Sequence, residues 1–239
     1  MVGLVDALGE ERAVIVGHDW GAVVAWHCAL LRPDVFSAVA LLSVPYLQRS
    51  WADPRPTERM KQLAGERHFY QLYFQEPGKA ETELEADVRK SMHMLLYSAS
   101  GDASPEDRWR FLFSKSEKFL DTGVAPELLP AWLTEADLDF LVSEFERTGF
   151  RGGLNWYRNL DGLWKLAPFL SGAKIRQPSL FIAGELDAVI AMYRLAFEDL
   201  EQTMPSLEKK VLLPGAGHWI QQERPAAVNE LLLQFLAAL

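Results

Sequence analysis

Short apolar runs without alternation stand near both ends of the chain, and helical patterns separate them. Residues 13–16 (AVIV) and 38–44 (AVALLSV) lack the regular polar positions of a half-solvated strand. Such runs are typical of strands that are buried on both faces. Residues 21–31, which end at Arg32-Pro33, predict a helix between them. A buried strand, a helix and a second buried strand together predict a βαβ unit in a parallel sheet.

The middle of the chain has a different pattern. No buried strand run occurs there, and aromatic and charged residues mix at helical spacing. This mixture predicts a cluster of helices joined by loops that contain Pro and Gly, with helical segments expected at residues 67–74, 84–97 and 135–147.

The α/β pattern returns toward the end of the chain. Residues 179–183 predict a buried strand, residues 209–213 predict another strand, and residues 193–202 and 226–239 predict helices. The simplest organisation is an α/β core with a mostly parallel sheet, interrupted by an inserted helical cap. We expect the core to comprise residues 1–47 and 171–239, and the cap residues 48–170.

Composition and charge exclude several classes of function. The 239 residues are 49% hydrophobic and carry a net charge of −9, which weighs against binding to nucleic acid or to an anionic membrane surface. No apolar run approaches the roughly 20 residues that span a bilayer. The first residues carry acidic side chains and lack a basic region, so we expect no secretory signal. The expected lack of a secretory signal and the single Cys28 together indicate a cytoplasmic protein. The oligomeric state stays open.

The stretch Gly17-His18-Asp19-Trp20-Gly21 joins the first predicted strand to the first predicted helix. A strand-to-helix turn of this form needs small residues on both sides, and it presents its central residue at the carboxyl end of the sheet. The amides at the start of the helix favour an anion there, so Asp19 is a candidate nucleophile. The alternative is that Asp19 only caps the helix.

Two further polar residues follow predicted strands. Asp187 lies in Gly184-Glu185-Leu186-Asp187, and His218 lies in a glycine-rich loop after the last strand. A histidine so placed can act as a base, and a carboxylate can orient it. Each residue alone is explained as well by an ordinary turn or loop. Together with Asp19 they appear in the order nucleophile, acid, histidine, which is the order of α/β-hydrolase triads.

At these residues the chain resembles the α/β-hydrolase superfamily and, within it, the soluble epoxide hydrolases. The segments GHDWGAVVAW and LLSVPY look like that family's, with Asp in place of Ser as the nucleophile. Two segments of the predicted cap are also similar, namely HFYQLYFQEPG from residue 68 and FRGGLNWYRN from residue 150. The resemblance covers nearly the whole chain.

The resemblance implies roles for individual residues. Tyr70 and Tyr157 match the family's two tyrosines, which point from the cap toward the nucleophile and donate a proton or a hydrogen bond to the epoxide oxygen. Asp19 would open the epoxide to form an ester, and water activated by His218, with Asp187 behind it, would hydrolyse that ester to a vicinal diol. No cofactor and no metal are expected, and the expected partner is a small apolar epoxide.

Trp20, the residue after the candidate nucleophile, does not distinguish epoxide hydrolysis from a related activity. The Trp20 backbone N–H is expected to face the oxyanion and its side chain to line the pocket. The haloalkane dehalogenases also place Trp after a nucleophilic Asp, so a dehalogenase is the alternative activity. The two cap tyrosines favour epoxide opening, because a departing halide needs no proton.

The chain departs from the family before the nucleophile. The family's sheet begins with several further strands and a His-Gly-x-Pro loop that supplies a second oxyanion donor, and no His-Gly-x-Pro occurs here. This departure predicts an N-terminally truncated hydrolase in which the strand at residues 13–16 becomes an exposed edge. It also leaves open a catalytically impaired remnant, since loss of one oxyanion donor costs about 2.7–4 kcal/mol in a serine protease.

Overall fold

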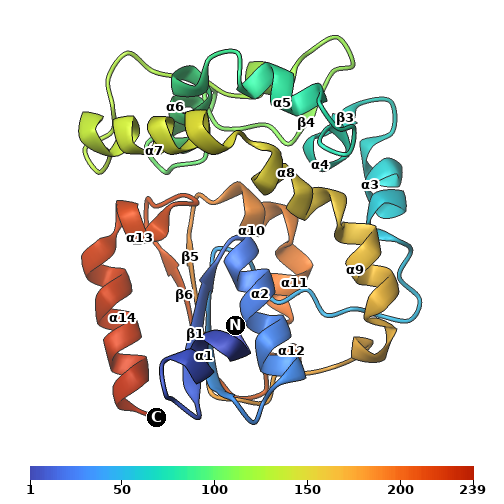
Figure 1. Cartoon of the computed structure of the whole chain (residues 1–239), viewed down its shortest axis with the longest axis vertical. Helices are drawn as coiled ribbons and strands as arrows, with labels where there is room; N and C mark the ends of the chain where they lie inside the picture. Colours follow the sequence, from blue (N-terminus) through green and yellow to red (C-terminus); the bar gives the residue numbers. More distant parts are fainter. The chain divides into compact units, whose positions relative to one another are not determined.

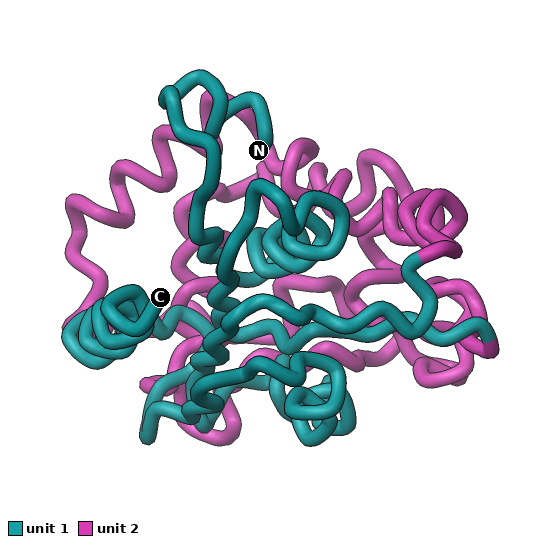
Figure 2. The backbone as a smooth tube through the Cα atoms, turned by 90° about the horizontal axis from the view of Figure 1, so that it is seen from below, with its two compact units in different colours: residues 1–51, 170–239 teal, residues 52–169 magenta.

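The computed structural model describes all 239 residues and divides them into two compact units. The first unit comprises residues 1–51 and 170–239, and the second comprises residues 52–169 (Figure 2). The second unit therefore begins and ends within four residues of the bounds that we expected for the cap, residues 48–170. The first unit contains the parallel sheet, and the second is mainly helical.

Four parallel strands form the sheet of the first unit, in the order β1-β2-β5-β6 (Figure 1). They are β1 (Ala13–His18), β2 (Phe36–Leu42), β5 (Ser179–Gly184) and β6 (Leu207–Leu213). The central strand β5 is buried along its whole length, as its unbroken apolar sequence predicts. β1 lies at one edge of the sheet, where Val16 is 47% exposed.

Helices cover both faces of this sheet, as its two-sided burial requires. Alternate residues of β2 belong to two different hydrophobic clusters: Val39 and Leu41 face one side, whereas Ala38, Ala40 and Leu42 face the other. The first face packs against α2 (Trp20–Leu31), and the second packs against α14 (Pro225–Ala237). Figure 1 shows α2 and α14 on opposite sides of the strands.

The remaining helices of the first unit are short. Residues 193–202 are largely helical, as expected, but turns at Tyr193 and Asp199 prevent one continuous helix. The segment forms two short helices, and a third short helix precedes them along the chain. The short helices of this unit are α1 (Val2–Ala7), α10 (Ala188–Met192), α11 (Arg194–Glu198), α12 (Leu200–Thr203) and α13 (Ile220–Glu223), and a 3-10 turn covers Pro168–Leu170 at its boundary.

The second unit contains a two-stranded antiparallel sheet that the sequence pattern does not predict. β3 (His68–Phe69) pairs with β4 (Leu112–Phe113), and the Tyr70 amide donates to the Phe111 carbonyl. The helix expected over residues 67–74 is therefore confined to α4 (Tyr70–Tyr73). Pairing with a distant segment outweighs the local helical pattern here.

Helices make up most of the ordered elements in the second unit. The helix expected over residues 84–97 is divided, because the Asp87 side chain accepts a hydrogen bond from the Lys90 amide and begins a new helix there. The helices are α3 (Pro56–Ala64), α5 (Lys79–Leu84), α6 (Val88–Ser98), α7 (Glu135–Thr148), α8 (Arg151–Arg158) and α9 (Leu160–Leu166), with a 3-10 turn at Phe119–Thr122. None of the chain's helices is both long and apolar enough to span a membrane.

Candidate active site

Asp19 lies on a strained turn between β1 and α2. Its φ of 53° is in the left-handed region that non-glycine residues rarely adopt. The side chain occupies the N-cap position of α2 but makes no capping hydrogen bond. The capping explanation for Asp19 therefore does not account for its carboxylate, which stays 36% exposed at the carboxyl end of the sheet.

The two glycines that flank this turn have different roles. A Cβ at position 17 would lie 2.1 Å from the carbonyl oxygen of Gly21, so Gly17 is required for the close approach of strand and helix. A Cβ at position 21 would meet no atom within 4 Å. The expectation that both sides of the turn need a small residue holds only for Gly17.

The structure brings Asp19, Asp187 and His218 together. His218 Nδ1 lies 3.0 Å from Asp187 Oδ2, and His218 Nε2 lies 3.3 Å from Asp19 Oδ2. His218 and Asp187 are buried, at 7% and 3% exposure, whereas Asp19 is the most exposed of the three. The imidazole thus lies between two carboxylates, one enclosed by protein and one accessible.

Asp187 has two functions at once. Its Oδ1 accepts a hydrogen bond of 2.8 Å from the Val189 amide and caps α10, while its Oδ2 faces the imidazole of His218. The capping bond fixes the carboxylate, and the fixed carboxylate in turn fixes the ring. A turn role and a catalytic role for this residue are therefore compatible.

The loop that carries His218 crosses directly over the end of β5. A Cβ at position 184 would lie 2.1 Å from the carbonyl oxygen of Gly217, so only glycine allows this approach. Gly184 is also where the chain turns toward Asp187. The same glycine therefore lets the acid loop and the histidine loop meet.

Electrostatics favour an ion pair in this cluster. Burial opposes the charged form of His218, but the charges and hydrogen bonds of Asp187 and then Asp19 outweigh it and raise the pKa of His218 well above its usual value. Burial likewise opposes ionisation of Asp19, but the hydrogen bond and charge of His218, together with the Trp20 amide, lower the pKa of Asp19. Asp19 is thus an ionised carboxylate at neutral pH, as a nucleophile must be.

Three side chains hold the backbone around His218, and the sequence analysis gave none of them a role in the site. The His218 carbonyl accepts hydrogen bonds from His18 Nε2 at 2.8 Å and from Ser43 Oγ at 2.9 Å. Buried Glu223 accepts from the amides of Gly217 and Trp219, on either side of His218. Ser43 follows β2 with a φ of 65°, and Glu223 ends α13. No sequence pattern marks these contacts, because each partner is distant along the chain or lies in a loop.

His18 is held neutral by its surroundings. Burial, followed by the charge of His218, lowers the pKa of His18 to about 4. Since a carbonyl oxygen only accepts, the bond to the His218 carbonyl requires the proton of neutral His18 to be on Nε2. His18 therefore has a structural role beside the turn at Asp19.

Tyr70 and Tyr157 belong to the second unit, where they meet each other. Their ring centroids are 5.7 Å apart in an edge-to-face arrangement. Gln75 Nε2 donates to the carbonyls of Gln71 and Tyr157, at 2.8 Å and 2.9 Å, and so links α4 to α8. The two tyrosines expected from different segments of the cap are therefore joined by ring contact and by one bridging amide.

A buried ion pair strengthens the same junction. Arg158, next to Tyr157, pairs with Glu81 at 2.7 Å, and both side chains are 12% exposed. Arg158 Nε also donates to the Phe74 carbonyl at 2.9 Å. Because breaking one partner of such a pair leaves an uncompensated charge, α8 is firmly held against the loop that follows α4.

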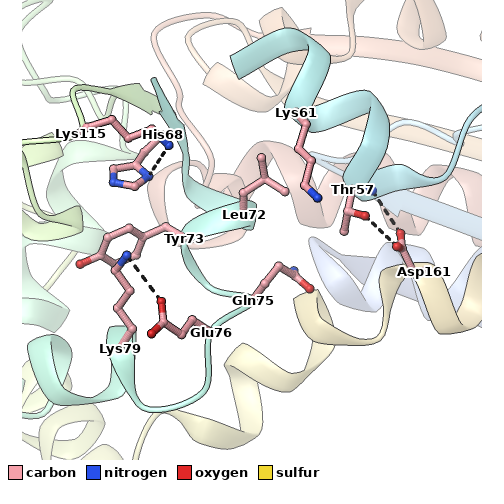
Figure 3. Close-up of a pocket in the computed structure, with 10 residues that line it drawn as sticks. All are labelled: Thr57, Lys61, His68, Leu72, Tyr73, Gln75, Glu76, Lys79, Lys115 and Asp161. Carbon is pink, nitrogen blue, oxygen red and sulfur yellow. Dashed lines mark hydrogen bonds and ion pairs between the residues drawn. The ribbon is translucent and has the colours of Figure 1, made fainter. Parts of the chain in front are cut away.

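A pocket of about 510 Å³ lies in the second unit, beside the segment that carries Tyr70 (Figure 3). Its polar groups largely satisfy each other: Thr57 donates to Asp161, Lys79 pairs with Glu76, and Lys115 approaches His68. None of the expected catalytic residues lines it, and no group of His, Cys, Asp and Glu in the structure is arranged to hold a metal ion.

Comparison with known proteins agrees with the α/β fold. Residues 1–231 match the model of the alpha/beta hydrolase family. The chain is 45% identical over 239 residues to epoxide hydrolase A of Mycobacterium tuberculosis, covering 100% of this chain and 73% of that protein. It is also similar to the solved structure of an epoxide hydrolase from an endophytic Streptomyces, with a TM-score of 0.93 and 48% identity over 98% of this chain and 70% of that one. Potato epoxide hydrolase I gives a TM-score of 0.87 and 34% identity over 100% of this chain and 74% of that one.

The strand order, the turn at Asp19 and the Asp187–His218 pair define a hydrolase of the α/β class. The chain belongs to the α/β-hydrolase family and, within it, to the epoxide hydrolases.

Proposed function

We propose that this protein hydrolyses epoxides to vicinal diols, with Asp19 as nucleophile and His218 as base. The observation that carries the proposal is the position of the accessible Asp19 carboxylate. The backbone of Asp19 has a positive φ, and its Oδ2 lies 3.3 Å from His218 Nε2. The relatives named epoxide hydrolase support the same reaction. An Asp nucleophile suits this chemistry because it attacks carbon directly as the carboxylate, without a base to activate it.

In the first half-reaction a carboxylate oxygen of Asp19 attacks one epoxide carbon from the side opposite the ring oxygen. The carbon–oxygen bond of the strained ring breaks, and the departing oxygen takes a proton from a phenol, for which Tyr70 and Tyr157 are the candidates. The product is an ester between Asp19 and the opened substrate. Two phenols suit this step, because they are neutral at pH 7 and able to donate.

Ester formation changes the charge that His218 experiences. The esterified Asp19 no longer adds its negative charge to that of Asp187, so the pKa of His218 falls and the imidazolium gives its proton to the phenolate, which restores the phenol. Asp187 still accepts from Nδ1 and leaves Nε2 able to accept a proton. The base is therefore produced at the stage that needs it.

In the second half-reaction neutral His218 accepts a proton from water while the water oxygen bonds to the ester carbonyl carbon. The Trp20 amide is placed to stabilise the resulting oxyanion. Collapse of this intermediate breaks the ester bond and releases the diol, which takes up the proton of the re-formed carboxyl group. Asp19 ends as a carboxylate and His218 as an imidazolium, as at the start.

A single-turnover experiment in ¹⁸O-labelled water tests the proposal. With enzyme in excess over styrene oxide, the diol should contain no label, because its new oxygen comes from the unlabelled Asp19 carboxylate. The label should instead appear in the Asp19 peptide by mass spectrometry. Labelled diol in the first turnover would show direct attack by water and would overturn the ester mechanism.

We further propose that the substrate is an apolar epoxide and that the protein is cytoplasmic. The aromatic and aliphatic content of the second unit supports an apolar epoxide, and the acidic composition with a single cysteine supports a cytoplasmic protein.

Release of halide from 1-bromobutane, measured beside diol formation from styrene oxide, separates the proposed activity from haloalkane dehalogenation. We expect diol and no halide.

A further inference from the structure

The side chain of Gln71 is buried next to Tyr70 with only one side of its amide engaged. Gln71 is 6% exposed, and its Nε2 donates to the Tyr70 phenol oxygen at 2.6 Å. Its Oε1 is buried and has no hydrogen-bond partner. An unpaired buried acceptor destabilises a fold, so packing alone does not explain a glutamine at this position.

We propose that Gln71 is a positioning residue for epoxide opening, which stabilises the developing phenolate of Tyr70 by donating to its oxygen. This inference rests on the proposed function, in which Tyr70 gives up its phenolic proton to the epoxide oxygen. A neighbour that accepts would compete with the epoxide for that proton. A neighbour that donates leaves the proton available and offsets the charge that forms when it departs.

The surroundings of Tyr70 increase the effect of this hydrogen bond. Its ring contacts Phe69, Phe74 and Trp109, with centroids 4.7–5.5 Å away. Tyr157 is the titratable side chain in ring contact with it. A phenolate among aromatic rings is poorly solvated, so a single fixed donor contributes more than it would in water.

Gln75 provides a matched comparison on the same segment. Its Nε2 donates two hydrogen bonds, and both acceptors are backbone carbonyls, those of Gln71 and Tyr157. Loss of the Gln75 amide should loosen α4 against α8 without changing the hydrogen bonding of a phenol oxygen. The two glutamines therefore separate an effect on position from an effect on acidity.

The test compares Gln71→Met, Gln75→Met and Tyr70→Phe, because Met fills nearly the same volume as Gln without its amide. Rapid-mixing measurements of ester formation from styrene oxide at a series of pH values give the rate of ester formation and its alkaline limit, which is the pH above which that rate falls. We expect Gln71→Met to form the ester about tenfold more slowly. Its alkaline limit should move up by about one pH unit, because the phenol holds its proton more tightly. Gln75→Met should change the rate without moving that limit.

A second readout keeps the inference falsifiable if the rate of Gln71→Met is too low to profile. Ultraviolet titration of the native protein, with the Tyr70→Phe titration subtracted, isolates the Tyr70 phenolate among the six tyrosines. It should appear at higher pH in Gln71→Met than in the parent protein. An unchanged alkaline limit and an unchanged titration would overturn the inference. If instead Tyr70→Phe forms the ester at the parent rate, the role of Tyr70 in the proposed function fails.

Discussion

The Ser43 hydroxyl donates a hydrogen bond of 2.9 Å to the backbone carbonyl of His218, which lies 175 residues further along the chain. Ser43 stands just beyond the end of β2, so the bond ties the histidine loop to a central strand of the sheet. His18 donates to the same carbonyl from the end of β1. The imidazole of His218 is thus positioned through its backbone as well as through Asp187.

This relationship predicts the effect of Ser43→Ala. Removing the hydroxyl should lower the free energy of unfolding by about 1 kcal/mol and reduce turnover severalfold, because the His218 carbonyl keeps only the bond from His18. Chemical denaturation and steady-state kinetics measure the two effects. Ser37→Ala is the control, since Ser37 lies on β2, the strand that Ser43 follows, and makes only a 3.4 Å contact to the Ala13 carbonyl. Equal behaviour of the two variants would contradict a positioning role for Ser43.

The turn at Asp19 predicts opposite outcomes for its two glycines. Gly17→Ala places a Cβ 2.1 Å from a backbone oxygen that cannot move without disturbing α2, so we expect a loss of at least about 3 kcal/mol in stability. Gly21→Ala meets no atom within 4 Å and should be tolerated within about 1 kcal/mol. Thermal unfolding of both variants measures the difference. A Gly17→Ala protein as stable as Gly21→Ala would show that the close approach is not required.

His18 predicts a loss of stability in acid. Its pKa is lowered to about 4 in the folded protein, below the ordinary value of 6.5. The unfolded chain therefore binds a proton that the folded one does not, and the free energy of unfolding decreases as the pH falls from about 6.5 to 4. The difference of about 2.5 pKa units corresponds to about 3 kcal/mol.

His18→Gln isolates this contribution. The amide keeps a donor for the His218 carbonyl and does not titrate, so the variant should lose less stability than the parent protein between pH 6.5 and pH 4. Urea denaturation at both pH values measures this difference, and the acidic groups shared by the two proteins cancel in the comparison. Identical pH dependence would mean that His18 titrates normally in the folded protein.

The two half-reactions predict different defects for Asp19 and His218. His218→Gln should still form the ester and fail to hydrolyse it, so the Asp19 peptide should gain the mass of the epoxide and turnover should stop. Asp19→Ala should form no ester and lose turnover by at least about 10⁴-fold. Mass spectrometry of the digested proteins after exposure to styrene oxide distinguishes the variants. A modified peptide in Asp19→Ala would place the nucleophile elsewhere.

Sequence patterns predicted the elements that are defined by their own residues. The mainly apolar runs predicted the positions of β1, β2 and β5, and β2 and β5 are buried on both faces as such runs indicate, whereas β1 lies at the edge of the sheet and is partly exposed. The pattern failed where the backbone pairs with a distant segment. His68 and Phe69 have helical surroundings in sequence, but they pair with β4 more than 40 residues away.

By itself the sequence determined the α/β class, and it predicted that Asp19, Asp187 and His218 each follow a strand in the order of a hydrolase triad, because these features depend on local pattern. Only the tertiary structure decided that Asp187 and His218 lie 3.0 Å apart, that Gly17 rather than Gly21 permits the turn, and that Ser43 and Glu223 hold the backbone around His218 while Gln71 donates to the Tyr70 phenol oxygen. The physical reason is that hydrogen bonds and steric contacts depend on distances of a few ångströms, which are set by packing between segments far apart in the chain.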